Sequence, residues 1–353
     1  MGNSLALSQR YAAYINKKIL LLGVLGASLV LTLLVSLSLG AAQIPLHDVL
    51  AALSGTPVDA RLKLIIWNIR LPQALSALLA GAGLAISGTV MQSILRNPLG
   101  SPFTLGISHA AAFGAALAVM LLGGFAQSHH SVASSIGPYC ITATAFALSI
   151  ITAALIVLIS RHQGTRSEVM VLSGVALGSL FTAATMFLQL IADDVQLAAM
   201  VFWTFGDTAR ASWTELGLMS VLLALCSAYF LWNSWAYNAI DIGDETAQGL
   251  GVQVSKIRFM GMLAASLLTA CIIAFLGIIG FVGLVVPHIC RKLTGADHRF
   301  LLPASFLGGA LLLLLSDTAA RLILAPHILP VSVLTAFMGA PVFLYLIIKG
   351  QRS

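Results

Sequence analysis

Residues 19–39 read ILLLGVLGASLVLTLLVSLSL, an apolar run of 21 residues without a charged side chain. About 20 apolar residues in a helix cross the ~30 Å hydrocarbon core of a bilayer. Lys17 and Lys18 before the run, and the small residues 40–42 after it, loosely resemble a signal peptide. The apolar part of a signal peptide is only about 7–15 residues long. We therefore interpret 19–39 as the first membrane-spanning helix.

The composition of the whole chain extends this interpretation. Of 353 residues, 59% are hydrophobic and 8% are charged, whereas soluble domains have roughly 25% charged residues. So few charges cannot cover a water-exposed surface of this size, and lipid must cover much of it. The apolar runs lack two-residue alternation, which favours helices over a barrel. The basic residues behind the net charge of +6 lie at the ends of these runs, as membrane topology requires, rather than in a nucleic-acid-binding patch.

Hydropathy predicts an all-α integral membrane protein with one domain over residues 1–353. The ten predicted spans are 19–39, 71–93, 103–122, 137–159, 169–191, 214–235, 257–276, 279–290, 301–324 and 330–348. The eighth is short and interrupted by Gly and Pro, so its length alone also suits a re-entrant segment. Ten crossings place most of the 18 Lys and Arg residues, including the basic cluster at 291–299, on the side of the N-terminus. The positive-inside tendency therefore predicts ten crossings, with both termini in the cytoplasm.

Polar connections between the spans carry no catalytic or metal constellation. Residues 40–70 and 192–213 are expected to be outer loops, and 233–258 a cytoplasmic connection with a short helical element. Asp193 and Asp194 are adjacent in a loop, unlike an acid and a base that face each other across a cleft. His129 and His130 lack a neighbouring Cys or carboxylate and make a poor metal site. We predict no catalytic residues, no metal site and no cofactor held by this chain.

The cytoplasmic connection contains a capped helix. Residues 241–252 read DIGDETAQGLGV, with acidic residues where a helix begins and glycines where it ends. Carboxylates favour the positive end of the helix dipole, and Gly suits a left-handed cap. A short capped helix on this face is shaped to fit a groove on another protein. An ordinary connector between two spans is the alternative, and spacing alone favours it.

A second segment begins at Arg70-Leu71-Pro72 and has small residues at 81, 85 and 88 on one helix face. Such residues allow close helix packing or a narrow groove. Here the chain resembles the FecCD-type permeases of ATP-binding-cassette (ABC) importers for iron–siderophore, haem and cobalamin. The matching motifs, in the family's order, are RLP at 70–72, GTVMQ at 88–92, NPL at 97–99, LGIS at 105–108, residues 243–252, GFVGLVVPHI at 280–289, DHR at 297–299, LP at 302–303 and GAP at 339–341 with Phe343.

This resemblance implies a ten-helix transmembrane bundle of the cobalamin and iron-chelate (type II) importer kind. It implies a second permease, commonly an identical copy, two separate ATPase subunits and a periplasmic or lipid-anchored binding protein. The ATPase-coupling loop, about 236–256, is expected to act through a set of residues in its helix. These are Gly243, Asp244, Glu245, Ala247, Leu250 and Gly251. The chain has no GxxxxGK[ST] phosphate loop, so ATP is used by the partner subunits.

Two basic residues match family positions that receive a binding protein. Arg70 and Arg321 are expected to dock it, so that reversing either charge weakens docking in a salt-sensitive way. Local pairing of Arg321 with Asp317, four residues earlier, is an equally good interpretation. A further arginine of the family is replaced by Gln73, which weakens the case for this contact.

The pathway and gate residues are expected near the cytoplasmic mouth. They are Asn97, Pro98, Ser108 and His109, although simple packing also explains His109. The spans hold almost no ionisable residue, with only His288 and Asp317 close to the membrane interior. An ion-coupled transporter usually places such groups at mid-membrane. The predicted function is import of an iron chelate, with a ferric siderophore first and haem or cobalamin next. A stand-alone secondary transporter or channel is the alternative.

Overall fold

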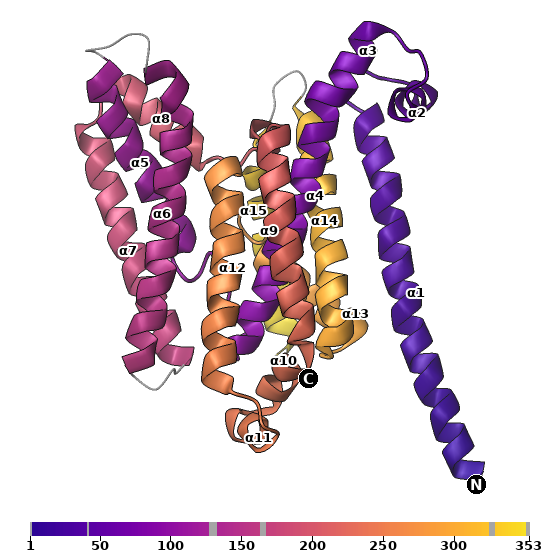
Figure 1. The fold of residues 1–353 in the computed structure, drawn as a ribbon. Helices are drawn as coiled ribbons and strands as arrows, with labels where there is room; N and C mark the ends of the chain where they lie inside the picture. Colours follow the sequence, from indigo (N-terminus) through magenta and orange to yellow (C-terminus); the bar gives the residue numbers. More distant parts are fainter. Residues whose placement is uncertain (1, 41, 127–132, 163–166, 325–328, 351–353) are drawn as a thin grey trace.

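The computed structural model describes residues 2–40, 42–126, 133–162, 167–324 and 329–350 (Figure 1). Within these residues the chain forms helices and no strand, which confirms the all-α prediction. Seven helices there are long and apolar enough to cross a membrane, and two more apolar helices are shorter. Together with the interrupted helix described below, they account for all ten predicted spans.

The ten long elements are α1 (Gly2–Ser38), α4 (Leu71–Ile94), α5 (Ile107–Ala126), α6 (Ala133–His162), α7 (Ser167–Ile191), α9 (Trp213–Trp232), α12 (Val254–Leu276), α13 (Val282–Thr294), α14 (His298–Ile323) and α15 (Val331–Gly350). Shorter elements are α2 (Leu46–Ser54), α3 (Ala60–Ile65), the π-helical η1 (Ile66–Arg70), α8 (Asp194–Thr204), η2 (Thr208–Arg210), α10 (Ser234–Ile242) and α11 (Asp244–Gly249). The helices α10 and α11 mark one end of the bundle, here called the α11 end. Helix α1 begins and α15 finishes at this same end (Figure 1).

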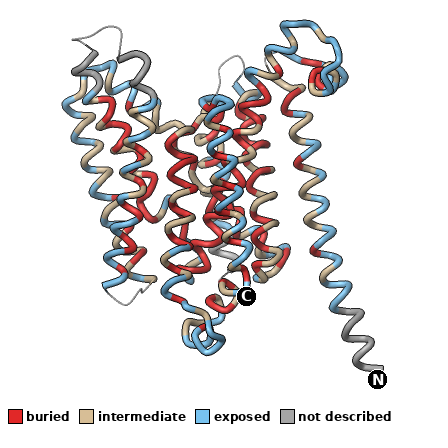
Figure 2. The backbone as a smooth tube through the Cα atoms, viewed as in Figure 1, coloured by how far each residue is buried: buried red, intermediate tan, exposed pale blue. Residues whose placement is uncertain are grey.

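Helix α4 forms the centre of the fold. Of its most apolar stretch, 83% is buried, against 11% for α1 (Figure 2). It packs against α14, α12 and α13. Glycine at two contact points allows this close packing. A Cβ at Gly81 would overlap the Gly309 carbonyl, and one at Gly88 would overlap the Gly283 carbonyl. The small residues predicted to form a tight helix face therefore do so.

The eighth span is a broken helix. Residues 277–281 are not helical, and α13 begins after Phe281, whose φ of 66° is unusual for a residue with a side chain. Gly277 lies beside the Trp203 carbonyl, whereas Gly295, just after α13, lies beside the Tyr14 hydroxyl and Lys18 of α1. The segment thus runs from the end carrying α8 toward the α11 end, as a crossing requires.

The expected loop at 40–70 is largely helical, so the loop prediction was wrong there. Helix α2 buries Val49 and Ala52, and Asp59 caps α3 by accepting a hydrogen bond from the Arg61 amide at 3.0 Å. Residues 192–213 likewise contain α8, which starts with a capping box between Asp193 and Gln196. These helices are too short for a hydropathy window to detect, although their caps were visible in the sequence.

The connection before α12 forms two helices rather than the single short one expected. Gly243 separates α10 from α11, with φ 150° and ψ 152°, a conformation that only glycine adopts readily. Asp244 and Glu245 occupy the first turn of α11, and Gly251 follows it with φ 84°. The predicted acidic start and glycine stop are confirmed.

Candidate functional site

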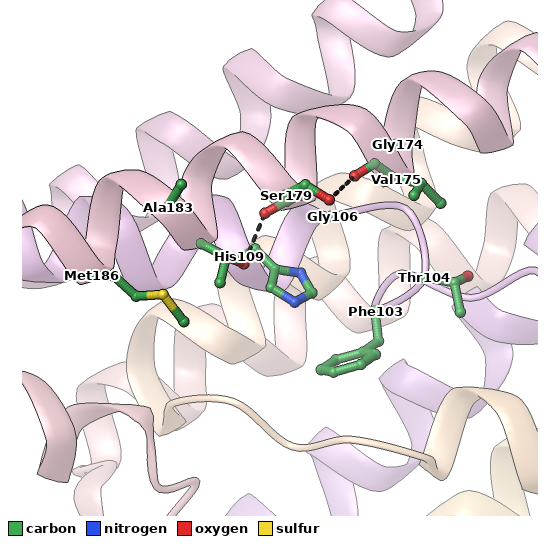
Figure 3. A pocket seen from close by; sticks show the side chains of 11 residues that line it. Phe103, Thr104, Gly106, His109, Gly174, Val175, Ser179, Ala183 and Met186 are labelled. Carbon is green, nitrogen blue, oxygen red and sulfur yellow. Dashed lines mark hydrogen bonds between the residues drawn. The ribbon is translucent and has the colours of Figure 1, made fainter.

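A cavity of about 530 Å³ lies where the start of α5 meets α7 (Figure 3). Its lining residues share small size or apolar character. They are Phe103, Thr104, Gly106, His109, Gly174, Val175, Gly178, Ser179, Thr182, Ala183 and Met186. His109, one of the four predicted pathway residues, lines this cavity, and its second wall is α7.

The α7 wall follows from a four-residue spacing. Gly174, Gly178, Thr182 and Met186 lie above one another on one helix face. The absence of side chains at the first two lets the chain at Gly106, with φ 75°, approach the helix backbone. The Thr182 hydroxyl donates to the Gly178 carbonyl at 2.9 Å, so the wall is left predominantly apolar. This row of small residues was a usable sequence signal that our interpretation missed.

The imidazole of His109 lies between the cavity and neighbouring side chains. Its ring centroid is 5.3 Å from that of Phe103, and its buried Nδ1 has no hydrogen-bond partner among the described residues. His109 therefore both packs and lines the cavity. Ser108 is 2% exposed and lines a much smaller neighbouring hollow together with Phe281.

The other two predicted gate residues lie outside the cavity. Asn97 and Pro98 form a turn just after α4, where the Asn97 side chain accepts a hydrogen bond from the Leu99 amide at 2.9 Å. Gly100 then donates its amide to the Asn97 carbonyl at 2.9 Å. This turn lies at the α11 end, since Arg96 before it approaches Asp244 to 4.0 Å.

Helix α11 presents an outward surface beside a small core of its own. Ala247 is fully buried and packs with Ile240 and Val254. By contrast, Ile242, the last residue of α10, and Leu250, directly after α11, are 70% and 68% exposed. Two large apolar side chains are thus left uncovered at an end of the bundle, where a partner protein can bury them.

Two carboxylates, Asp241 and Asp297, connect α10 with the start of α14. Burial alone would raise the pKa of Asp241. The hydrogen bond with His298 and the charge of His298, together with the hydrogen bond from Ser93 and the charge of Arg291, outweigh burial and lower this pKa. Burial has the same effect on Asp297, where hydrogen bonds from Arg299 and Asn238 bring the pKa down to about 2. Both groups are therefore carboxylates that their surroundings stabilise.

Arg70 is buried beneath the end of α1. It is 5% exposed and donates hydrogen bonds to the carbonyls of Leu37 at 2.6 Å, Ser38 at 2.9 Å, and Ala42. Carbonyls at a helix end lack helical partners, so Arg70 satisfies them. Its docking role stays a prediction, and its hydrogen bonds show a structural role.

Arg321 takes part in a buried polar cluster. Its Nε lies 3.1 Å from Asp317 Oδ2, as an ion pair without the alignment of a hydrogen bond, and its Nη2 donates to the Ser36 hydroxyl at 2.6 Å. The pairing with Asp317 is thus present, while docking by Arg321 stays a prediction. Gln73 donates to Asp317 Oδ1 at 3.0 Å, and the Thr208 hydroxyl donates to the same oxygen.

Titratable groups elsewhere do not gather into a metal site. Among the described residues, no three His, Cys, Asp or Glu side chains are grouped to hold a metal ion. The four cysteines are free. His129 and His130 lie outside the described residues.

A bundle of membrane-spanning helices with a lined cavity and an exposed helix at one end is the architecture expected of a membrane transport permease. The chain belongs to the FecCD transport family, whose model matches residues 28–349. It is 49% identical to a Methanocaldococcus jannaschii protein named as an ABC transporter permease, over 98% of each chain. It is 38% identical to the hemin transport system permease HmuU of Yersinia pestis, over 92% of this chain and 95% of the relative.

A solved structure agrees with these sequence matches. A metal-chelate type ABC transporter in an inward-facing conformation superposes with a TM-score of 0.80 and 35% identity. The superposition covers 93% of this chain and 98% of that one. The chain is therefore a non-enzymatic, multi-pass permease subunit of an ABC importer in the inner membrane.

Proposed function

We propose that this permease imports an iron chelate, with a ferric siderophore as the first expected cargo and haem or cobalamin next. The cavity carries the proposal, because its volume of about 530 Å³ falls in the range of small-molecule sites. Among the described residues that line it, none is a carboxylate that could bind a bare cation, and His109 is the one titratable side chain. The hemin permease relative and the metal-chelate transporter structure support the same substrate class.

The exposed surface of α11 is the proposed docking site for the ATPase subunits. Ile242 before α11 and Leu250 after it offer apolar area, and Glu245 in the first turn of α11 is exposed as well. A short helix with these features fits a groove on a partner. Two ATPase copies bind there and use the ATP, so the α11 end and both chain termini lie in the cytoplasm. The basic residues predicted at this end support that orientation.

The remaining proposed partners are a second permease, which contacts the cavity, and a binding protein, which contacts the opposite end of the bundle. One side of the cavity is open along α7, where Val175 and Met186 are 54% and 63% exposed. A second, identical permease closes it and completes a central pathway. A periplasmic or lipid-anchored binding protein delivers the chelate near Arg70 and Arg321.

Reconstitution in liposomes tests the proposal. The permease, its ATPase and its binding protein are expected to take up a labelled ferric siderophore, haem or cobalamin only when ATP is supplied on the α11 side. Uptake by the permease alone, driven by an ion gradient, would instead establish the stand-alone transporter. Failure of the ATPase to bind the permease would also contradict the proposal.

A further inference from the structure

One buried side chain connects three helices at the α11 end. Arg258, in the first turns of α12, is 5% exposed. Its Nη1 and Nη2 bind the two carboxylate oxygens of Asp244 at 2.7 and 2.8 Å. Its Nε donates to the carbonyl of Ile94, the last residue of α4, at 2.8 Å. The guanidinium thus holds the start of α11 against the end of the central helix.

A second connection lies one residue away. Asp241, at the end of α10, accepts a hydrogen bond from the Ser93 hydroxyl at 2.6 Å. Its other oxygen lies 2.9 Å from Nε2 of His298, the fully buried first residue of α14. Two consecutive residues of α4, Ser93 and Ile94, are therefore bound to the connection that carries α11.

The end of α4 leads directly into the wall of the cavity. Arg96 turns the chain with φ 47°, and short-range hydrogen bonds hold the following residues. The Asn97 amide donates to the Gln92 carbonyl at 3.0 Å, and the Thr104 hydroxyl donates to the Leu99 carbonyl at 3.1 Å. The first of these hydrogen bonds ties the connection to the end of α4, and the connection leads to the cavity residues between Phe103 and His109.

We propose that Arg258 is the positioning residue that passes movement of α11 to the cavity. When α11 shifts, Asp244 moves with it. The two hydrogen bonds between Asp244 and Arg258 pass this movement to Ile94 and to the turn after it. The planar guanidinium is needed because it binds a carboxylate with two nitrogens and a carbonyl with the third. Lysine keeps the charge but cannot hold both acceptors in fixed directions. This inference rests on the proposed ATPase docking at α11.

Coupling between ATP hydrolysis and uptake tests the inference in the complete transporter. The permease, ATPase and binding protein are reconstituted with the wild type, Arg258→Lys or Asp244→Asn, and with Lys17→Gln in α1 as an exposed control outside the coupling loop. ATPase co-purification, ATP hydrolysis and chelate uptake are measured for each. We expect Arg258→Lys to bind the ATPase and hydrolyse ATP while its uptake per ATP falls about tenfold, as loss of a typical coupling energy predicts. Lys17→Gln should match the wild type.

The outcomes separate the two proposals. An unchanged uptake per ATP in Arg258→Lys would overturn the role of Arg258 and leave the proposed function intact. A wild-type permease that binds no ATPase would overturn both. If Arg258→Lys does not assemble, the isosteric Asp244→Asn decides the matter, because it breaks the same ion pair. Normal uptake per ATP in that variant would likewise reject the inference. A merely structural ion pair would lower the thermal midpoint without changing the ratio.

Discussion

Gly88 of α4 lies directly against Gly283 of α13, so closely that a Cβ on Gly88 would overlap the Gly283 carbonyl. The contact seats the broken eighth span against the central helix. Of the glycines in the described part of the chain, Gly88 leaves the least room for an added methyl group.

Gly88→Ala is expected to destabilise the fold by about 3 kcal/mol, because the backbone of α13 must move to admit the methyl group. Thermal unfolding in detergent measures this change. Gly26→Ala in α1 is the matched control, since no described atom beyond its chain neighbours and its own turn of helix backbone lies within 4 Å of its Cβ position. There the better helix propensity of Ala should leave stability equal or raise it by about 0.5–1 kcal/mol. Equal behaviour of the two variants would contradict the observed packing.

Arg70→Met is expected to lower the free energy of unfolding by about 3 kcal/mol. The substitution removes hydrogen bonds from a charged donor to carbonyls at the end of α1, each of which is worth about 1.5–3 kcal/mol. Arg61→Met, at an exposed position, is the control and should change little. If both variants unfold at the wild-type temperature, Arg70 does not hold α1. Arg70→Lys keeps a cation in the buried site and therefore separates the loss of hydrogen bonds from the loss of charge.

Acidification should weaken the contacts that Asp297 makes with Arg299 and Asn238. The ordinary pKa of its carboxyl is 3.8, and hydrogen bonds from Arg299 and Asn238 outweigh burial and lower it to about 2. A lowered pKa in the folded state adds stability above the ordinary pKa and loses it as the pH falls toward about 2. The thermal midpoint of the wild type should therefore drop through this window. Asp297→Asn should lack that part of the drop, and parallel curves for the two proteins would refute the assignment.

Filling the cavity should block transport. Ser179 lines the cavity and is exposed, so Ser179→Phe can narrow it without disturbing the packed core. Uptake of labelled chelate into liposomes is expected to fall at least about tenfold while the ATPase still binds. Ala176→Phe places the same side chain on an exposed part of α7 outside the cavity and should retain uptake. Unimpaired uptake by Ser179→Phe would remove this cavity from the pathway.

The sequence alone determined the class of the protein and the approximate positions of its ten spans. Both depend on local properties, namely the length of apolar runs and the charges beside them. The ends of α11 were also predictable, since acidic residues and glycines act within one or two turns. The same kind of local signal is present at the starts of α3 and α8, where Asp59 and Asp193 cap the helices, but loops were predicted at both places.

Only the tertiary structure decided which residues meet. Arg258 and Ile94 are 164 positions apart in the chain, and Gln73 and Asp317 are 244 apart. Arg70 read as a surface cation in the sequence and is instead bound to the end of α1. The cavity forms between the turn at Gly106 and the α7 face that carries small residues. Neither segment's sequence indicates that it packs against the other. Such contacts depend on how the helices pack, and packing is set by complementary shapes that no single segment contains.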